Sequence, residues 1–318
     1  MGQRLDAWLA RFARPRRRER LPVLLDRRRV YVLPTGFGLF FALLMLAMLA
    51  GALNYNNNPA LMLCLLLGTT GLASLIAAHL QLSGLRVDTV HAEPVPAGQP
   101  LLLQVGLASR DGRVRRGLQL RYGARQSHVP ALQQEPVVAT IDIPTEVRGL
   151  LTLERLHLST TQPLGLARAW SWVWPEVTLL VYPKAEQQGP PLPEGGGSAR
   201  QSVLNPAGED VHHLRPYRPG DPQRAVAWKP SARRDTLMVR EFEQPRGVEV
   251  MLDWQGLSAL PYEQRIQRLA HWVDLAEQQA RRYRLALPGQ APLGPSQGPG
   301  HRHLCLRALA LLPREAPR

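Results

Sequence analysis

Two long apolar runs near the start of the chain constrain its fold most. Gly36 to Leu53 is a run of 18 residues without a charge, and Ala60 to Leu80 is a second run interrupted only by small or weakly polar residues and His79. Each run is long enough to cross the hydrocarbon core of a bilayer as a helix. The polar segment Asn54 to Pro59 between them is typical of a tight turn. The sequence therefore predicts a two-helix membrane hairpin over residues 34–82.

The segment before this hairpin, residues 1–33, is strongly basic. Residues 1–29 hold 10 arginines against three acidic residues, a net charge of +7 out of the formal +14 of the whole chain. Arginine-rich flanks remain on the cytoplasmic side of a membrane, so we expect both termini in the cytoplasm. Because half of the charge is confined to this segment and no base-stacking platform or reader motif goes with it, no nucleic-acid partner is expected.

The first residues also show a helical period. Leu5, Trp8, Leu9 and Phe12 fall at i, i+3, i+4 and i+7 and are edged by arginines, so an amphipathic helix here can bind anionic membrane lipid. Alternatively, the arginines only fix the topology. A third interpretation is a signal peptide cleaved after Ala50-Gly51-Ala52. The long basic region, the length of the apolar core and the second span argue against it.

Residues 83–183 change to short alternating segments separated by turn residues, which predicts an all-β sandwich in the cytosol. The expected strands are 101–107, 118–122, 137–143, 150–158 and 177–182. Trp170, Trp172 and Trp174 alternate along one face, where they are expected to cover the sandwich or meet the membrane interface rather than bind a ligand. Residues 184–207, which include the sequence PLPEGGGS, are expected to form a linker that does not pack.

The remaining residues, 208–318, have the pattern of a truncated α/β domain. An apolar strand over 248–253, a helix over 261–283 and a strand over 284–287 follow in the order that begins a doubly wound sheet, and a last helix starts near Leu304. About thirty residues remain after the second strand, so we expect only half of such a domain.

The segment Gly208 to Gln244 is dense in charged and aromatic residues, and its local chemistry is readable. Arg218-Pro219-Gly220-Asp221 has the residues of a type II turn, with Asp221 as the N-cap of a short helix that ends near Lys229. Residues 236–243 alternate as a strand does. We call Gly208–Gln244 the signature block.

The signature block resembles that of the bacterial "domain of unknown function 58" family, whose pattern runs G-E-E/D, L-R-x-Y-x-x-G-D, I/V-x-W-K-x-x-A-R and L-x-V-R-E-F/Y. The matching residues are Glu209, Leu214, Arg215, Tyr217, Gly220, Asp221, Trp228, Lys229, Ala232, Arg233, Val239, Arg240, Glu241 and Phe242. A weaker piece is Arg148-Gly149 followed by Thr161 to Leu166, in which Gln162 replaces the usual Asp. Residues 305–310 at the end of the chain also fit. The α/β half-domain is similar to the start of a von Willebrand factor A domain, as the family leads one to expect.

This resemblance implies an inner-membrane adaptor or scaffold without enzymatic activity or cofactor. Family members are typically encoded beside a MoxR-type AAA+ ATPase and often beside a transglutaminase-like membrane protein, which are therefore the expected partners in assembling or activating envelope or metalloenzyme components. The residues expected to carry partner recognition are Arg215, Tyr217, Arg218, Asp221, Trp228, Lys229, Arg233, Arg240 and Glu241. Alternatively, the same charges form an internal ion-pair lattice that docks the block on the half-sheet.

Several chemical sites were weighed against this interpretation. A metal-ion-dependent adhesion site needs Asp-x-Ser-x-Ser, but after Asp253 the serine positions hold Gln255 and Leu257, so Asp253 is expected to be a turn acid. The histidine pairs 212–213 and 301/303 lack cysteine partners at zinc-finger spacing. No phosphate loop or nucleophile elbow is found. The open alternative is a hydrolase or cell-wall-linked enzyme with a site around Glu209, Asp221 and Lys229.

Overall fold

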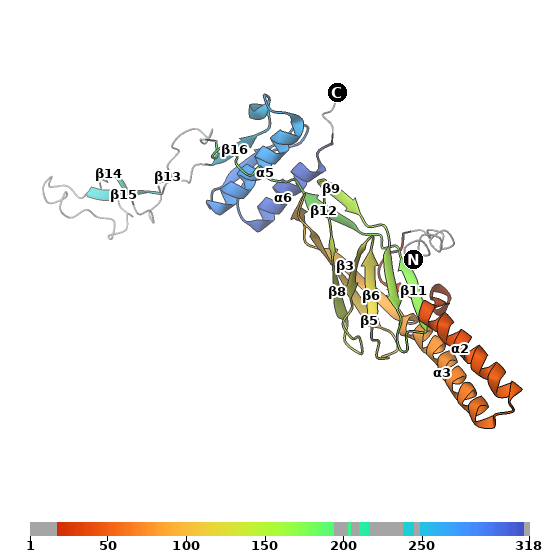
Figure 1. Ribbon diagram of the computed structural model, residues 1–318. Helices are drawn as coiled ribbons and strands as arrows, with labels where there is room; N and C mark the ends of the chain where they lie inside the picture. The colour runs from red at the N-terminus through yellow and green to blue at the C-terminus, as the bar shows by residue number, and fades with distance from the viewer. Residues whose placement is uncertain (1–17, 194–202, 205–209, 217–237, 245–248, 315–318) are drawn as a thin grey trace. The chain divides into compact units, whose positions relative to one another are not determined.

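The computed structural model describes residues 18–193, 203–204, 210–216, 238–244 and 249–314 (Figure 1). The chain divides into two compact units between Val181 and Tyr182, and each unit is described by itself. The predicted amphipathic helix over residues 5–12 and the predicted turn and helix over 218–229 lie outside the described residues.

Both apolar runs are helices, as predicted. Helix α2 spans Gly36–Asn54 and helix α3 spans Asn58–Leu82, with mean hydropathies of 2.3 and 2.1. The side chains of Thr35 and Asn57 cap their N-termini by accepting hydrogen bonds from Gly38 N (3.0 Å) and Ala60 N (3.1 Å). Both helices are long and apolar enough to cross a membrane. Only 11% of the most apolar window of α2 and 17% of that of α3 are buried, so the protein itself covers little of this surface.

The base of the helix pair packs tightly against the first unit. Thr35 donates from Oγ1 to the carbonyl of Gly165 over 2.6 Å. A Cβ placed on Gly38 would lie 1.9 Å from the carbonyl oxygen of Leu166, so only glycine fits there. At the same end of the pair, Ala78 and Leu82 near the C-terminus of α3 are buried in the hydrophobic core. The helix pair is thus fixed to the β-rich part of the first unit.

The first unit is a sandwich of antiparallel sheets. A four-stranded sheet has the order β1-β3-β5-β8, a five-stranded sheet the order β2-β11-β10-β6-β7, and a small third sheet the order β4-β12-β9. Their strands are β1 (Val23–Leu24), β2 (Tyr31–Pro34), β3 (Leu85–Ala92), β4 (Val95–Pro96), β5 (Leu101–Ser109), β6 (Leu118–Tyr122), β7 (Arg125–His128), β8 (Val137–Ile143), β9 (Gly149–Thr152), β10 (Leu156–Thr160), β11 (Ala167–Val173) and β12 (Thr178–Tyr182).

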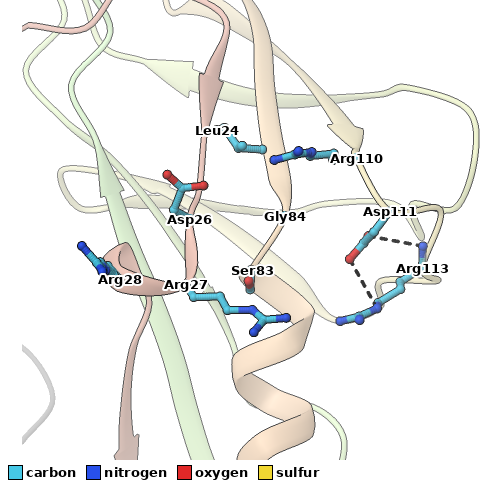
Figure 2. Close-up of a pocket in the computed structure, with 9 residues that line it drawn as sticks. All are labelled: Leu24, Asp26, Arg27, Arg28, Ser83, Gly84, Arg110, Asp111 and Arg113. Atoms are coloured by element: carbon cyan, nitrogen blue, oxygen red, sulfur yellow. Dashed lines mark hydrogen bonds and ion pairs between the residues drawn. The ribbon is translucent and has the colours of Figure 1, made fainter.

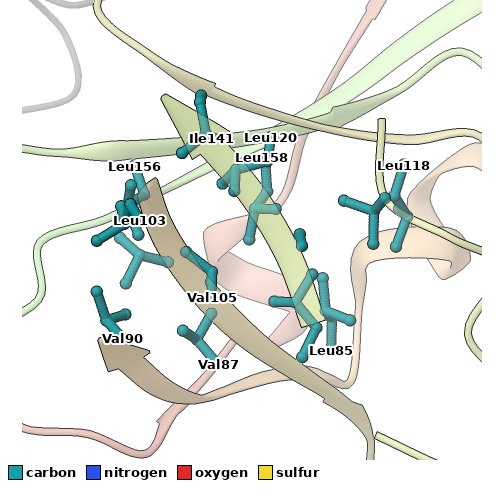
Figure 3. Close-up of a cluster of buried hydrophobic side chains, with 14 of the residues drawn as sticks. Leu85, Val87, Val90, Leu103, Val105, Leu118, Leu120, Ile141, Leu156 and Leu158 are labelled. Carbon is teal, nitrogen blue, oxygen red and sulfur yellow. The ribbon is translucent and has the colours of Figure 1, made fainter. Parts of the chain in front are cut away.

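One apolar core lies between the two large sheets (Figure 3). Val87 and Leu103 enter it from the four-stranded sheet, while Leu120 and Leu158 enter it from the five-stranded sheet. All four side chains are fully buried. This alternation of buried and exposed positions is what predicted a sandwich from the sequence.

Two features of the sandwich differ from the sequence prediction. Residues 23–34, assigned above to an N-terminal cytosolic segment, form β1 and β2, which pair with β3 and β11. Both strands are short, and the strands that they pair with lie after α3 in the sequence. The strand predicted over 150–158 is two strands, because β9 pairs with β12 whereas β10 pairs with β6 and β11. Leu153 is buried in the crossing between them.

The second unit contains the predicted strand, helix and strand. Strand β16 (Val250–Asp253) pairs in parallel with β17 (Tyr283–Ala286), and helix α5 (Tyr262–Gln278) connects them. Strand β18 (Leu293–Ser296) adds antiparallel to β17, and helix α6 (Pro299–Leu311) follows. The last helix therefore begins earlier than its predicted start near Leu304. Its turns pack through Cys305, Leu306 and Leu309, which are buried.

The linker prediction is wrong for its first ten residues. The carboxylate of Glu186 forms an ion pair with Arg268 of α5, and its Oε1 lies 3.1 Å from the Nη2 donor. The indole Nε1 of Trp272 donates to the carbonyl oxygens of Pro190 and Pro191, each over 3.1 Å. Proline removes backbone donors but leaves carbonyl acceptors, so a proline-rich stretch can still pack where a helix supplies the donors.

Candidate functional site

Part of the signature block forms a β-ladder. Strand β14 (Asp210–Pro216) pairs antiparallel with β15 (Met238–Gln244), and β13 (Val203–Leu204) pairs with the other edge of β15. In this register Arg215 is opposite Val239, Leu214 is opposite Arg240, and His213 is opposite Glu241. The two strands, whose paired residues are 22 to 33 positions apart in the sequence, are therefore adjacent in the fold.

The ladder accounts for three of the residues expected to recognise a partner: Arg215 on β14, and Arg240 and Glu241 on β15. The other six lie outside the described residues: Tyr217, Arg218, Asp221, Trp228, Lys229 and Arg233. Glu209, the third member of the alternative enzymatic site, also lies outside them.

Asp253 lies at the carboxyl end of β16, where a doubly wound sheet places its ligands. Its Oδ1 accepts a hydrogen bond from Gln255 N over 3.0 Å and so starts the short 3₁₀ helix η3 (Gln255–Leu257). Behind this turn, Arg265 donates to the carbonyls of Leu260 (2.7 Å) and Ser258 (2.6 Å). Asp253 is therefore bonded as a turn acid. Within the described ranges, no three His, Cys, Asp or Glu residues gather as metal ligands.

A buried polar network joins β17, α5 and α6. Tyr283 donates to Glu277 Oε1 over 2.9 Å, and Gly298 N donates to both oxygens of the same carboxylate over 3.0 Å. His301 Nε2 lies 3.1 Å from the carbonyl oxygen of Tyr283 and 3.6 Å from Cys305 Sγ. Burial, together with the charge of Glu277, raises the pKa of Cys305 to about 12. The cysteine is thus a protonated thiol at neutral pH, and the network joins elements rather than supplying a nucleophile.

An arginine-rich pocket lies in the first unit where α3 ends (Figure 2). Its volume is about 630 Å³. Three segments line it: the region around the 3₁₀ helix η1 (Arg27–Arg29), the junction of α3 with β3, and the connection from β5 to β6. The lining residues are Leu24, Asp26, Arg27, Arg28, Ser83, Gly84, Arg110, Asp111 and Arg113.

Arg115, directly behind this pocket, is fully buried. Its Nη1 donates to the carbonyls of Leu80 (2.9 Å) and Gln81 (2.8 Å), and its Nη2 donates to Asp111 Oδ1 (2.6 Å). The last carbonyls of a helix have no partners within the helix, and a cation there also offsets the helix dipole. Arg115 thus caps α3 from inside the protein.

The electrostatics of Asp111 follow from these contacts. Burial acts to raise the pKa of the Asp111 carboxyl, but the hydrogen bond from Ser109 and the charges of Arg115 and Arg113 outweigh it and hold the pKa below its usual value. Burial lowers the pKa of Arg115, and the charge of Asp111 offsets part of this. Both groups remain charged at neutral pH.

Sequence reasoning missed this pocket, because its arginines come from two segments, residues 27–28 and 110–113, which are separated by the apolar helix pair and by strands β3 and β5. A usable signal is the dense run of arginines at 110, 113, 115 and 116, which follows directly after a buried strand.

The described parts define a class of protein: two apolar helices that precede a β-rich body with an α/β unit. Residues 213–271, which include the second half of β14, all of β15 and the start of the α/β unit, match the model of the family described as "Protein of unknown function DUF58". Over this segment the chain is similar to the DUF58 family.

A curated relative is "Uncharacterized protein YeaD" of Bacillus subtilis (strain 168), which is 30% identical over 121 residues. The match covers 37% of this chain, and the chain spans only 30% of the relative's length. No solved structure matches the chain.

Proposed function

We propose that this chain is a membrane-anchored adaptor that binds a MoxR-type AAA+ ATPase through its signature block. In this proposal α2 and α3 span the cytoplasmic membrane, and both units face the cytoplasm. In this proposal the second unit is also a metal-free relative of the von Willebrand factor A domain. A transglutaminase-like membrane protein is a further expected partner.

The membrane anchor is supported by the exposure of the two helices. Phe40, Leu43 and Leu46 of α2 are each more than 60% exposed, as is Met62 of α3. A contiguous apolar surface of this kind needs a membrane or a partner to cover it. The exposed arginines at the base of the pair, such as Arg27 and Arg110, favour the cytoplasmic side for the body.

The observation that carries the adaptor function is the β14–β15 ladder. In its register, Arg240 is opposite Leu214, the residue just before Arg215. Charged residues from both strands of the signature block therefore occupy neighbouring register positions. Arginine is among the residue types favoured at the energetic centres of protein interfaces. The second half of β14 and all of β15 also lie within the segment that matches the DUF58 model, which is where a function shared by the family is expected.

The first test is an affinity pull-down of the full-length protein, solubilised in mild detergent from its own cells, with and without ATP and followed by mass spectrometry. The test variant carries Arg233→Glu and Arg240→Glu. Since truncating a central interface arginine commonly costs about 2 kcal/mol or more, recovery of the ATPase is expected to fall at least roughly tenfold.

The matched control carries Arg281→Glu and Arg307→Glu, two exposed arginines of the second unit that change the net charge equally. It is expected to recover the ATPase like the wild type. Unchanged recovery by a folded test variant would contradict the proposal. Recovery of wall-synthesis enzymes without an ATPase would instead direct the search to catalysis around Asp221.

A further inference from the structure

The arginine-rich pocket at the end of α3 is not used by the adaptor function. Of its two carboxylates, Asp111 is bonded to Arg115 and lies 3.3 Å from Arg113 Nε. Arg27, Arg28 and Arg110 are exposed, and none of them has an ion pair among the residues that the structure describes. Asp26 is the other carboxylate, and the three arginines outweigh its charge. The pocket is therefore a cationic hollow in which Arg27, Arg28 and Arg110 have no ion-pair partner among the described residues.

The pocket is also rigidly built. Gly84 N donates to the carbonyl of Leu25 over 2.9 Å, and Arg110 N donates to the carbonyl of Gly84 over 3.1 Å, so backbone hydrogen bonds join all three walls. Gly84 has a φ of +81°, and a Cβ there would lie 3.1 Å from Arg115 Nη2. The glycine thus leaves room for the buried Arg115. A preformed cavity of about 630 Å³ falls in the size range of small-molecule sites.

The position of the pocket along α3 indicates its ligand. Helix α3 has 25 residues and is therefore about 37 Å long. An upright helix that begins at the far side of a core of about 30 Å extends roughly 7 Å beyond it, which is about the depth of the headgroup layer. Ser83 and Gly84, which follow α3 directly, then lie at the level of the lipid phosphates.

We propose that this pocket binds the phosphate group of an anionic phospholipid in the leaflet next to the protein body. Arg27 and Arg28 would contact the phosphate from η1, and Arg110 would contact it from the β5–β6 connection. The paired N–H donors of a guanidinium group match the geometry of phosphate oxygens. The lipid would hold η1 and the β5–β6 connection together around the end of α3. The inference rests on the membrane insertion proposed above but not on the ATPase.

The test uses the full chain in nanodiscs of phosphatidylcholine with a minor fraction of phosphatidylglycerol. Native mass spectrometry counts the phosphatidylglycerol that the released protein retains. The variant with Arg27→Gln, Arg28→Gln and Arg110→Gln is expected to retain it roughly 10- to 100-fold less well, since each arginine near an anionic surface contributes to binding. The control with Arg125→Gln, Arg281→Gln and Arg307→Gln removes the same charge elsewhere and is expected to match the wild type.

Three results would overturn the proposal. The first is equal retention by the pocket variant and the control. The second is equal retention of phosphatidylcholine and phosphatidylglycerol by the wild type. The third is displacement of the lipid by inorganic phosphate at the same concentration, which would assign the pocket to a soluble phosphate compound. Failure of the wild type to enter nanodiscs would overturn the membrane anchor as well, whereas loss of ATPase recovery alone would leave this inference standing.

Discussion

Replacing Arg115 with methionine tests whether a buried arginine fixes the apolar helix pair to the sandwich. The substitution keeps an unbranched side chain in the core but removes the donors to Leu80 O, Gln81 O and Asp111. Two helix carbonyls then lose their partners, and Asp111, whose side chain is 31% exposed, loses its buried cation. Leaving buried acceptors without their charged donor costs about 1–3 kcal/mol for each group, or about 3–5 kcal/mol in all. At about 2–4 °C per kcal/mol for a unit of this size, the unfolding midpoint should fall by roughly 6–20 °C.

The assay is thermal unfolding of the full chain in nanodiscs, followed by tryptophan fluorescence, with hydrogen exchange at the end of α3 as a local readout. The matched control is Arg113→Met. Arg113 also pairs with Asp111, at 3.3 Å, but its side chain is 49% exposed, so its loss should cost no more than about 1 kcal/mol. Equal shifts in the two variants, or a shift below about 3 °C for Arg115→Met, would refute the reasoning that burial makes Arg115 decisive.

Three further predictions concern other parts of the structure. Gly38→Ala should destabilise the attachment of α2 and lower the unfolding midpoint, because the new Cβ would overlap the carbonyl oxygen of Leu166. Gly36→Ala should leave the midpoint unchanged, because nothing lies within 4 Å of a Cβ at that position. Equal midpoints for the two variants would contradict this prediction. Because the folded pKa of Asp111 is lowered, its stabilisation is complete above the ordinary pKa and is lost as pH falls through the folded value. Wild type should therefore lose stability relative to Asp111→Asn below about pH 4, and parallel stability curves would be evidence against it. Finally, in a Cys64→Ser background Cys305 should resist alkylation at pH 8 until the protein unfolds, since burial raises its pKa to about 12; rapid labelling of the folded chain would rule this out.

The sequence predicted best those elements whose signal is local and repetitive. Length and hydropathy alone give α2 and α3, and alternation gives the strands of the sandwich core such as Leu101–Ser109. The strand, helix and strand of the second unit follow from the same periodicities. Strands β1 and β2 could not be recognised, because their pairing partners lie beyond the helix pair.

The candidate sites depended on contacts that a sequence does not display. In the sequence, Arg115 cannot be distinguished from a solvent-exposed arginine. Only the fold brings it to the C-terminal end of α3, where the carbonyls of Leu80 and Gln81 accept its hydrogen bonds. The resemblance of the signature block agrees with the match of residues 213–271 to the DUF58 model, and the ladder register then showed which distant residues of the block are neighbours. Asp253 was expected to be a turn acid from the residues that follow it, and its hydrogen bond to Gln255 N agrees.

The most direct measurement of the adaptor function is site-specific photo-crosslinking in living cells. A photoreactive amino acid at Glu241, on β15 in the family segment, is compared with one at Val138, which is 54% exposed on the sandwich. We predict an adduct of the Glu241 probe with an AAA+ ATPase that changes with nucleotide supply, and no such adduct from position 138. Absence of an ATPase adduct at Glu241, or equal adducts at both positions, would contradict the account.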